Sequence, residues 1–155
     1  GAMSGFSQAS AGGAVGAKLL YPDGRLQHVG MILGVNGIAA HAYHQHPGSI
    51  HGYMGSAIGP RNFSAVTAAC LMTRRAVFDH AGGFDEAFPV DFNDVDFSYK
   101  VRSTGGRLLW LANVELYHFE SQTRDRVVYP WEYQLVTQRW GIPRRDPFLP
   151  GSRAG

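Results

Sequence analysis

Residues 14–33, AVGAKLLYPDGRLQHVGMIL, decide the fold. An apolar run at 14–21 is followed by PDGR at 22–25, in which proline presets φ and glycine accepts a positive φ. A second apolar run at 26–33 completes the pattern of two strands joined by a tight turn. The sequence therefore predicts a β-hairpin near the N-terminus, and with it a sheet.

The remainder of the chain alternates strand patterns with helix patterns. The expected elements are a strand buried on both faces at 64–73, a short helix at 75–81 stopped by Gly82-Gly83, a helix from Asn93 as N-cap to about Thr104, one or two strands at 107–117, and an amphipathic helix at 131–140. A glycine-rich loop is expected at 34–59. This order predicts an α/β fold, a mixed sheet flanked by helices with a β-hairpin near the N-terminus.

Composition narrows the class of protein. The length of 155 residues fits one domain, and 45% hydrophobic with 17% charged residues excludes a disordered chain. A single cysteine excludes a disulfide framework. The net charge of +2 comes from the 122–155 region, and basic and aromatic residues do not interleave as in RNA-binding proteins. We therefore expect no nucleic-acid partner.

The sequence contains no run near the roughly 18 to 20 apolar residues of a membrane-spanning helix. No charged segment followed by an apolar one opens the chain, as it would in a signal peptide. We therefore expect a cytoplasmic protein, with the full-length protein peripherally associated with the inner face of the membrane.

The densest charge feature is residues 85–96, which hold five acidic residues and no Lys or Arg. Crowded carboxylates raise one another's pKa and suit general-base catalysis or metal binding. Helical spacing places Asp94 on the side of Phe97 and Val101, whereas Asp96 points roughly the opposite way. A solvated acidic loop is the alternative, and Asp96 has a structural alternative as a capping partner of Asn93.

Histidines offer a second group of candidate ligands. His41, His44, His46 and His51 fall in the predicted 34–59 loop and leave open a small zinc-binding protein. His118 follows the apolar run 114–117, at a strand end where sheet proteins place ligand-binding groups. A histidine in either place also fits a surface or core role.

Five segments in this order resemble the C-terminal half of bacterial family 2 glycosyltransferases. They are VGAKLLYPDGRLQHVG at 15–30, SAVTAACLMTRR at 64–75, GGFDEAF at 82–88, FNDVDF at 92–97 and ELYHFES at 115–121. The resemblance covers residues 15–147, and the ordered set is much more specific than any one segment.

The resemblance implies the acceptor-binding half of a GT-A fold, which in such enzymes follows a nucleotide-binding half. It implies that Asp94, second in the Asn93-Asp94 pair, is the general base of an inverting transfer. It implies that His118 joins the site of a divalent metal, Mn²⁺ or Mg²⁺, and the donor diphosphate. The expected partners are a nucleotide-sugar donor and a saccharide or lipid-linked acceptor in cell-surface polysaccharide synthesis.

Further donor-phosphate or acceptor contacts are assigned to Gly83, Phe84, Asp85, Asp96 and Arg124, although an exposed surface arginine is as good a reading of Arg124. The glycine-rich, aromatic-bearing residues 40–60 are a candidate acceptor loop. For Trp131, Tyr133 and Trp140, packing of the last helix is favoured over a sugar-stacking platform.

The family's Asp-x-Asp metal motif lies upstream of the matched region. The Asp94-Val95-Asp96 segment is not that motif, because at about 100° per residue its carboxylates diverge by about 200°. We therefore expect residues 1–13 to be a tag remnant and flexible leader, 14–147 the acceptor-binding region of a longer enzyme, and 148–155 a tail. We expect this region to be inactive alone. The alternative is a non-catalytic carbohydrate-binding or interaction module on a degenerate scaffold.

Overall fold

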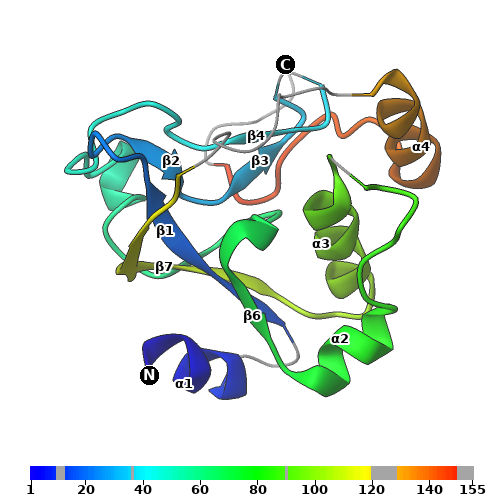
Figure 1. The fold of residues 1–155 in the computed structure, drawn as a ribbon, viewed down its shortest axis with the longest axis horizontal. Helices are drawn as coiled ribbons and strands as arrows, with labels where there is room; N and C mark the ends of the chain where they lie inside the picture. The colour runs from blue at the N-terminus through cyan, green and yellow to red at the C-terminus, as the bar shows by residue number, and fades with distance from the viewer. Residues whose placement is uncertain (10–12, 36, 90, 120–128, 150–155) are drawn as a thin grey trace.

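The computed structural model describes residues 1–9, 13–35, 37–89, 91–119 and 129–149. Its elements are α1 (Ala2–Ala9), β1 (Ala14–Leu20), β2 (Leu26–His28), β3 (Met31–Leu33), β4 (Ala39–His41), η1 (Tyr53–Gly55), β5 (Arg61–Asn62), η2 (Ala68–Cys70), β6 (Leu71–Thr73), α2 (Arg75–Ala81), α3 (Asn93–Ser103), β7 (Leu108–Tyr117) and α4 (Pro130–Trp140). In Figure 1, β1, β6 and β7 cross the centre, with α3 and α4 to their right and α1 below. The predicted α/β class, with a mixed sheet flanked by helices and an N-terminal hairpin, is confirmed.

Strand β1 is the centre of the main sheet. The strand order is β2-β1-β7-β5, and β6 also pairs with β1. β1 runs antiparallel to β2 and β6 but parallel to β7, with Ala14 opposite Leu108 and Leu20 opposite Tyr117. All seven residues of β1 are buried, as expected for a strand with partners on both edges.

The β1–β2 hairpin forms at the predicted turn, where Tyr21 N–H donates to Arg25 O at 2.8 Å. Its second strand, β2, is shorter than expected, because the chain passes through Gly30 with a φ of 102°, outside the range of an extended strand. A Cβ at this position would collide with the Phe63 ring, so the position requires glycine. The chain then enters a separate two-stranded sheet, in which β3 pairs antiparallel with β4. The predicted strand at 26–33 is thus two strands, and the predicted 34–59 loop contains a third.

The strand predicted over residues 64–73 is wrong for most of its length. Thr67 accepts a hydrogen bond from Ala69 N–H through its hydroxyl and so begins the short 3₁₀ helix η2. Only β6 is a strand, and among the described residues its one partner strand is β1, with Met72 38% exposed. A run of small apolar residues did not distinguish a buried strand from a capped turn.

Helix α2 has the predicted bounds, and Gly82 ends it in the left-handed conformation with a φ of 82°. Helix α3 also forms where expected, but its cap lies one residue earlier than predicted. Phe92, with a φ of 62°, occupies the N-cap position, and Asn93 is the first helical residue. The proposed capping pair of Asn93 and Asp96 therefore does not form.

Residues 2–9 form helix α1, which packs against β1, β6 and β7, where the sequence suggested a flexible leader. Alanine favours helix, and the buried Ser7 hydroxyl is satisfied by donating to Ser4 O at 3.0 Å. The helix therefore covers part of the sheet.

Two hydrophobic cores meet at α3. The larger contains Phe97 and Val101 of α3, together with side chains of β1 and β7. The smaller contains Val95 of α3, Met31 of β3 and Val136 of α4. Because both cores hold α3, the start of this helix is rigidly placed. No helix in the described part of the chain has the length and apolar character needed to cross a bilayer.

Candidate functional site

Asp94 lies half-buried in the first turn of α3, facing η2. The residue two before it, Phe92, has a φ of 62°, a conformation that is costly for a bulky side chain and is held by its surroundings. Strain of this kind clusters at functional sites. The strained conformation of Phe92 thus fixes the direction in which the first residues of α3 leave the N-cap.

Neutral donors surround the Asp94 carboxylate. Oδ1 accepts from Val95 N–H at 2.8 Å, and Oδ2 accepts from Ala68 N–H at 3.3 Å. The Thr67 hydroxyl is a further hydrogen-bonding partner. Within the described residues no Lys, Arg or His forms an ion pair with Asp94.

Burial raises the pKa of Asp94, and the hydrogen bonds from Ala68, Thr67 and Val95 offset only part of that rise. A desolvated carboxylate without a cationic partner is more basic than one in water. It therefore suits proton abstraction from a hydroxyl better than an ordinary surface aspartate does.

His28 forms a hydrogen bond to the turn that contacts Asp94. Thr67 N–H donates to His28 Nε2 at 3.3 Å. The proton of the neutral ring therefore lies on Nδ1, which is 2.8 Å from Nδ1 of His41. Sequence reasoning singled out His41 but missed His28, because a lone histidine at a strand end has no distinguishing pattern.

His28 is completely buried. Burial first, and the nearby His41 second, hold the pKa of His28 well below 6.5. His28 is consequently neutral at pH 7, and its ring is a fixed hydrogen-bonding bridge between His41 and Thr67. Thr67 in turn contacts Asp94.

Asp96, two residues further along α3, has a different environment. Its side chain is fully buried, and Oδ1 accepts from Arg139 Nη1 at 2.9 Å and from Trp140 Nε1 at 2.8 Å. Oδ2 forms an ion pair with Lys100 at 2.8 Å. These contacts join α3 to α4, so the predicted role of Asp96 as a ligand contact remains a prediction beside an evident structural role.

The 83–85 segment lies close to the same ion-pair cluster. Asp85 pairs with Arg139 at 2.7 Å, and its pKa is lowered by Ala87 N–H and by Arg139. Phe84 packs with Phe97 at a ring-centroid distance of 5.0 Å, and Gly83 O accepts from Lys100 at 3.2 Å. Their ligand contacts stay predictions, and Arg124 lies outside the described residues.

His118 follows β7 directly, as predicted, and its backbone N–H donates to Leu20 O at 2.8 Å. Both ends of the Gln27 side-chain amide contact His118 Nδ1, the nitrogen at 2.7 Å and the oxygen at 2.9 Å. The contact therefore holds the ring in place and is compatible with a proton on either ring nitrogen. The role of His118 as a metal ligand stays a prediction, and the described residues place no group of three or more His, Cys, Asp or Glu together to hold a metal ion.

Three of the four loop histidines, His41, His44 and His46, are engaged with other rings. His44 Nε2 lies 2.9 Å from the Tyr21 hydroxyl, and the His46 ring meets Tyr43 edge-on. His41 pairs with His28. The zinc-binding alternative therefore finds no ligand cluster among the residues that the structure describes.

The aromatic side chains of α4 mainly pack. Trp140 stacks on Tyr99 at 5.0 Å with an interplanar angle of 8°, and Tyr133 meets Phe92 edge-on. Trp131 is 47% exposed and stacks with Tyr129. The packing interpretation holds for Trp140 and Tyr133, while Trp131 remains at the surface.

Several known proteins are similar to this chain. Protein y4gI of Sinorhizobium fredii, described as uncharacterized, is 40% identical over 146 residues, which are 89% of this chain and 16% of y4gI. The O-antigen biosynthesis protein RfbC of Myxococcus xanthus is 38% identical over 141 residues, 88% of this chain and 11% of RfbC. The N-acetylglucosaminyl-diphospho-decaprenol L-rhamnosyltransferase of Mycobacterium tuberculosis is 28% identical over 61 residues, 39% of this chain and 20% of that enzyme.

The chain therefore spans 16% of the length of y4gI and 11% of RfbC, the two relatives that it matches over most of its own length. No family model and no solved structure matches it.

Proposed function

We propose that this chain is part of a longer glycosyltransferase of surface-polysaccharide synthesis, and that it supplies the general base and part of the acceptor site. The observation on which the proposal rests is Asp94, a carboxylate without a cationic partner among the described residues, with a raised pKa at a strained helix start. The similarity to an O-antigen biosynthesis protein and to a rhamnosyltransferase supports the substrate class. We further propose an inverting family 2 enzyme of GT-A fold.

In the proposed reaction, an Asp94 oxygen accepts the proton of an acceptor hydroxyl. The hydroxyl oxygen then forms a bond to the anomeric carbon of the donor sugar, while the bond from that carbon to the diphosphate breaks and takes its electron pair. Attack from the opposite face inverts the anomeric configuration. The hydrogen bonds from Ala68 and Thr67 fix the carboxylate during this step.

We also propose that His118 faces a divalent cation, which would neutralise charge on the leaving diphosphate. Its place directly after strand β7 supports this assignment. The other ligands would come from outside the described residues. We predict that His118→Ala in the full-length protein weakens metal-dependent donor binding, whereas an unchanged metal requirement would contradict the assignment.

The test is a transfer assay on the full-length protein with nucleotide-activated sugars, saccharide and lipid-linked acceptors, and Mn²⁺ or Mg²⁺. We expect Asp94→Asn to lower the transfer rate by about 10²- to 10⁴-fold, with donor binding nearly unchanged and the fold retained. The matched control is Asp79→Asn, which removes an exposed carboxylate of α2 and should leave the rate unchanged.

Near-normal turnover by Asp94→Asn would remove Asp94 as the base. If the wild-type protein transfers no sugar from any donor but binds saccharides, the result supports the alternative of a non-catalytic carbohydrate-binding module.

A further inference from the structure

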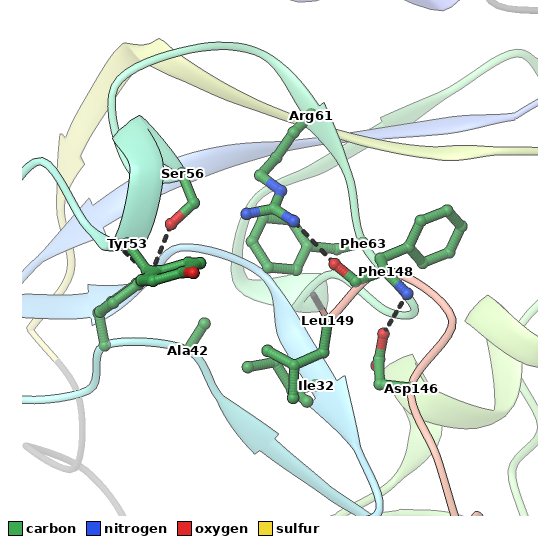
Figure 2. Close-up of a pocket in the computed structure, with 10 residues that line it drawn as sticks. Ile32, Ala42, Tyr53, Ser56, Arg61, Phe63, Asp146, Phe148 and Leu149 are labelled. Atoms are coloured by element: carbon green, nitrogen blue, oxygen red, sulfur yellow. Dashed lines mark hydrogen bonds between the residues drawn. The ribbon is translucent and has the colours of Figure 1, made fainter. Parts of the chain in front are cut away.

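A cavity of about 200 Å³ lies between the 53–63 segment, β3 and the 146–149 segment. Figure 2 shows it with the Arg61 guanidinium near its centre. Its walls combine aromatic rings with a few polar groups, and the side chains that matter here are Tyr43, Tyr53, Ser56, Arg61, Phe63 and Phe148. Neither Asp94 nor His118 lines it.

Arg61 has unused hydrogen-bonding capacity in this cavity. It donates to Phe148 O at 2.8 Å and lies over the Phe63 ring, with 4.9 Å between the guanidinium carbon and the ring centroid. No carboxylate pairs with Arg61 anywhere in the described ranges. The acid that lines the cavity, Asp146, instead accepts N–H groups of Leu33 and Phe148. The remaining guanidinium donors are available to a ligand oxygen.

The opposite wall supplies hydroxyl groups. The Tyr43 hydroxyl and Ser56 Oγ are 2.5 Å apart, and Tyr53 N–H donates to the Tyr43 hydroxyl at 2.8 Å. Tyr43 and Met54 have φ values of 54° and 51°, so this loop is held in a conformation that side chains rarely adopt. Tyr53 is 66% exposed and forms an aromatic rim where a ligand can enter.

Flat apolar rings with a few directed polar groups match a sugar, which has apolar C–H faces and hydroxyl edges. Pockets for drug-sized ligands measure about 300–1,000 Å³, so this smaller cavity suits a single ring. We propose that the cavity binds one neutral pyranose unit, with Arg61 donating to a ring hydroxyl and Tyr53 covering a face of the sugar. The inference rests on the proposed function, in which this unit belongs to the acceptor.

The test measures binding of methyl pyranosides to the 155-residue chain by NMR titration, with inorganic phosphate as a second probe. A single sugar has about a dozen non-hydrogen atoms, so we expect a dissociation constant of about 1 mM. Arg61→Met should weaken binding at least about tenfold, because a charged hydrogen bond is lost. Tyr53→Ala should weaken it about threefold to tenfold, whereas Tyr53→Phe should not.

The matched control is Ile58→Ala, an exposed residue of the same loop that does not line the cavity. Because Tyr53 is mostly exposed, Tyr53→Ala tests the proposal even if Arg61→Met fails to fold. Absence of glycoside binding, binding insensitive to both variants, or Arg61-dependent binding of phosphate in place of the glycoside would each overturn it.

The proposed function and this site can fail separately. Asp94→Asn should leave pyranoside binding unchanged. A full-length protein that transfers sugar normally with Arg61→Met and Tyr53→Ala would overturn the pyranose site alone. A protein that binds pyranosides through Arg61 but transfers nothing would overturn the proposed function alone.

Discussion

Two carboxylates two residues apart on α3 have opposite surroundings. Asp94 receives only neutral donors among the described residues, and burial raises its pKa. Asp96 is more deeply buried, yet it forms ion pairs with Lys100 and Arg139 and accepts a hydrogen bond from Trp140. The difference teaches that burial alone does not mark a reactive acid. What distinguishes Asp94 is burial without a compensating cation.

The largest expected effect concerns the Asp96 side of this comparison. Asp96→Ala should lower the free energy of unfolding by about 3 kcal/mol, because it leaves two cations without their shared partner. Breaking a buried ion pair usually costs about 3–5 kcal/mol. We expect the lower end of that range, because the Lys100 and Arg139 side chains are 19% and 30% exposed and can be hydrated. Urea unfolding measures it, with Asp94→Ala as the matched variant. An equal loss in both variants would break the distinction.

The next effect is the pH dependence of stability that comes from His28. Because the pKa of His28 in the folded protein lies below 6.5, the unfolded chain binds the extra proton first as pH falls. Its contribution to stability is present above pH 6.5 and is lost below it, at about 1.4 kcal/mol per pH unit for one proton. His28→Gln should flatten this part of the pH profile. An unchanged slope in His28→Gln would assign the titration to other groups.

The third prediction concerns Asp94 itself. A raised pKa means that the folded protein favours the protonated acid. The contribution of Asp94 to the free energy of unfolding is therefore full below pH 3.8 and is lost as pH rises through the pKa of the folded state. Asp94→Asn should therefore raise the melting temperature near pH 7, with the gain disappearing towards pH 3. A melting temperature lowered at pH 7 would show that the hydrogen bonds to the charged form outweigh its burial.

The smallest effect compares two ion pairs with the same helical spacing. Arg75 and Asp79 pair at 2.8 Å on α2, but the Arg75 side chain is 88% exposed. Arg75→Ala should change the free energy of unfolding by no more than about 0.5 kcal/mol, far less than the loss of the buried Lys100–Asp96 pair. A loss approaching that of Asp96→Ala would show that spacing, and not burial, decides the value of such pairs.

Sequence rules for turns and helix ends predicted the elements whose bounds depend on neighbouring residues. Helix α2 has its expected bounds because Gly82 ends it, and the hairpin forms because PDGR at 22–25 specifies a turn. Asp94 was placed correctly at the start of α3. Its lack of a cation could not be read from the sequence, since Lys100 lies six residues away and pairs with Asp96 instead.

Long-range packing decided the features that sequence reasoning missed. The Phe63 ring lies against Gly30, where the second predicted strand is interrupted. His28 accepts a hydrogen bond from Thr67, the residue that begins η2. Arg61 enters the cavity only because the 146–149 segment folds back to it. Each of these contacts joins residues more than 30 apart, beyond the reach of turn rules and periodicity.

The parallel pairing of β1 with β7 also has a consequence for synthesis. About 90 residues separate the end of β1 from the start of β7, so at about 5–20 residues per second the ribosome takes roughly 5–20 s to supply the partner. During that interval an apolar strand, fully buried once folded, has one edge unpaired. The nascent chain therefore exposes an aggregation-prone edge until residue 117 has left the exit tunnel.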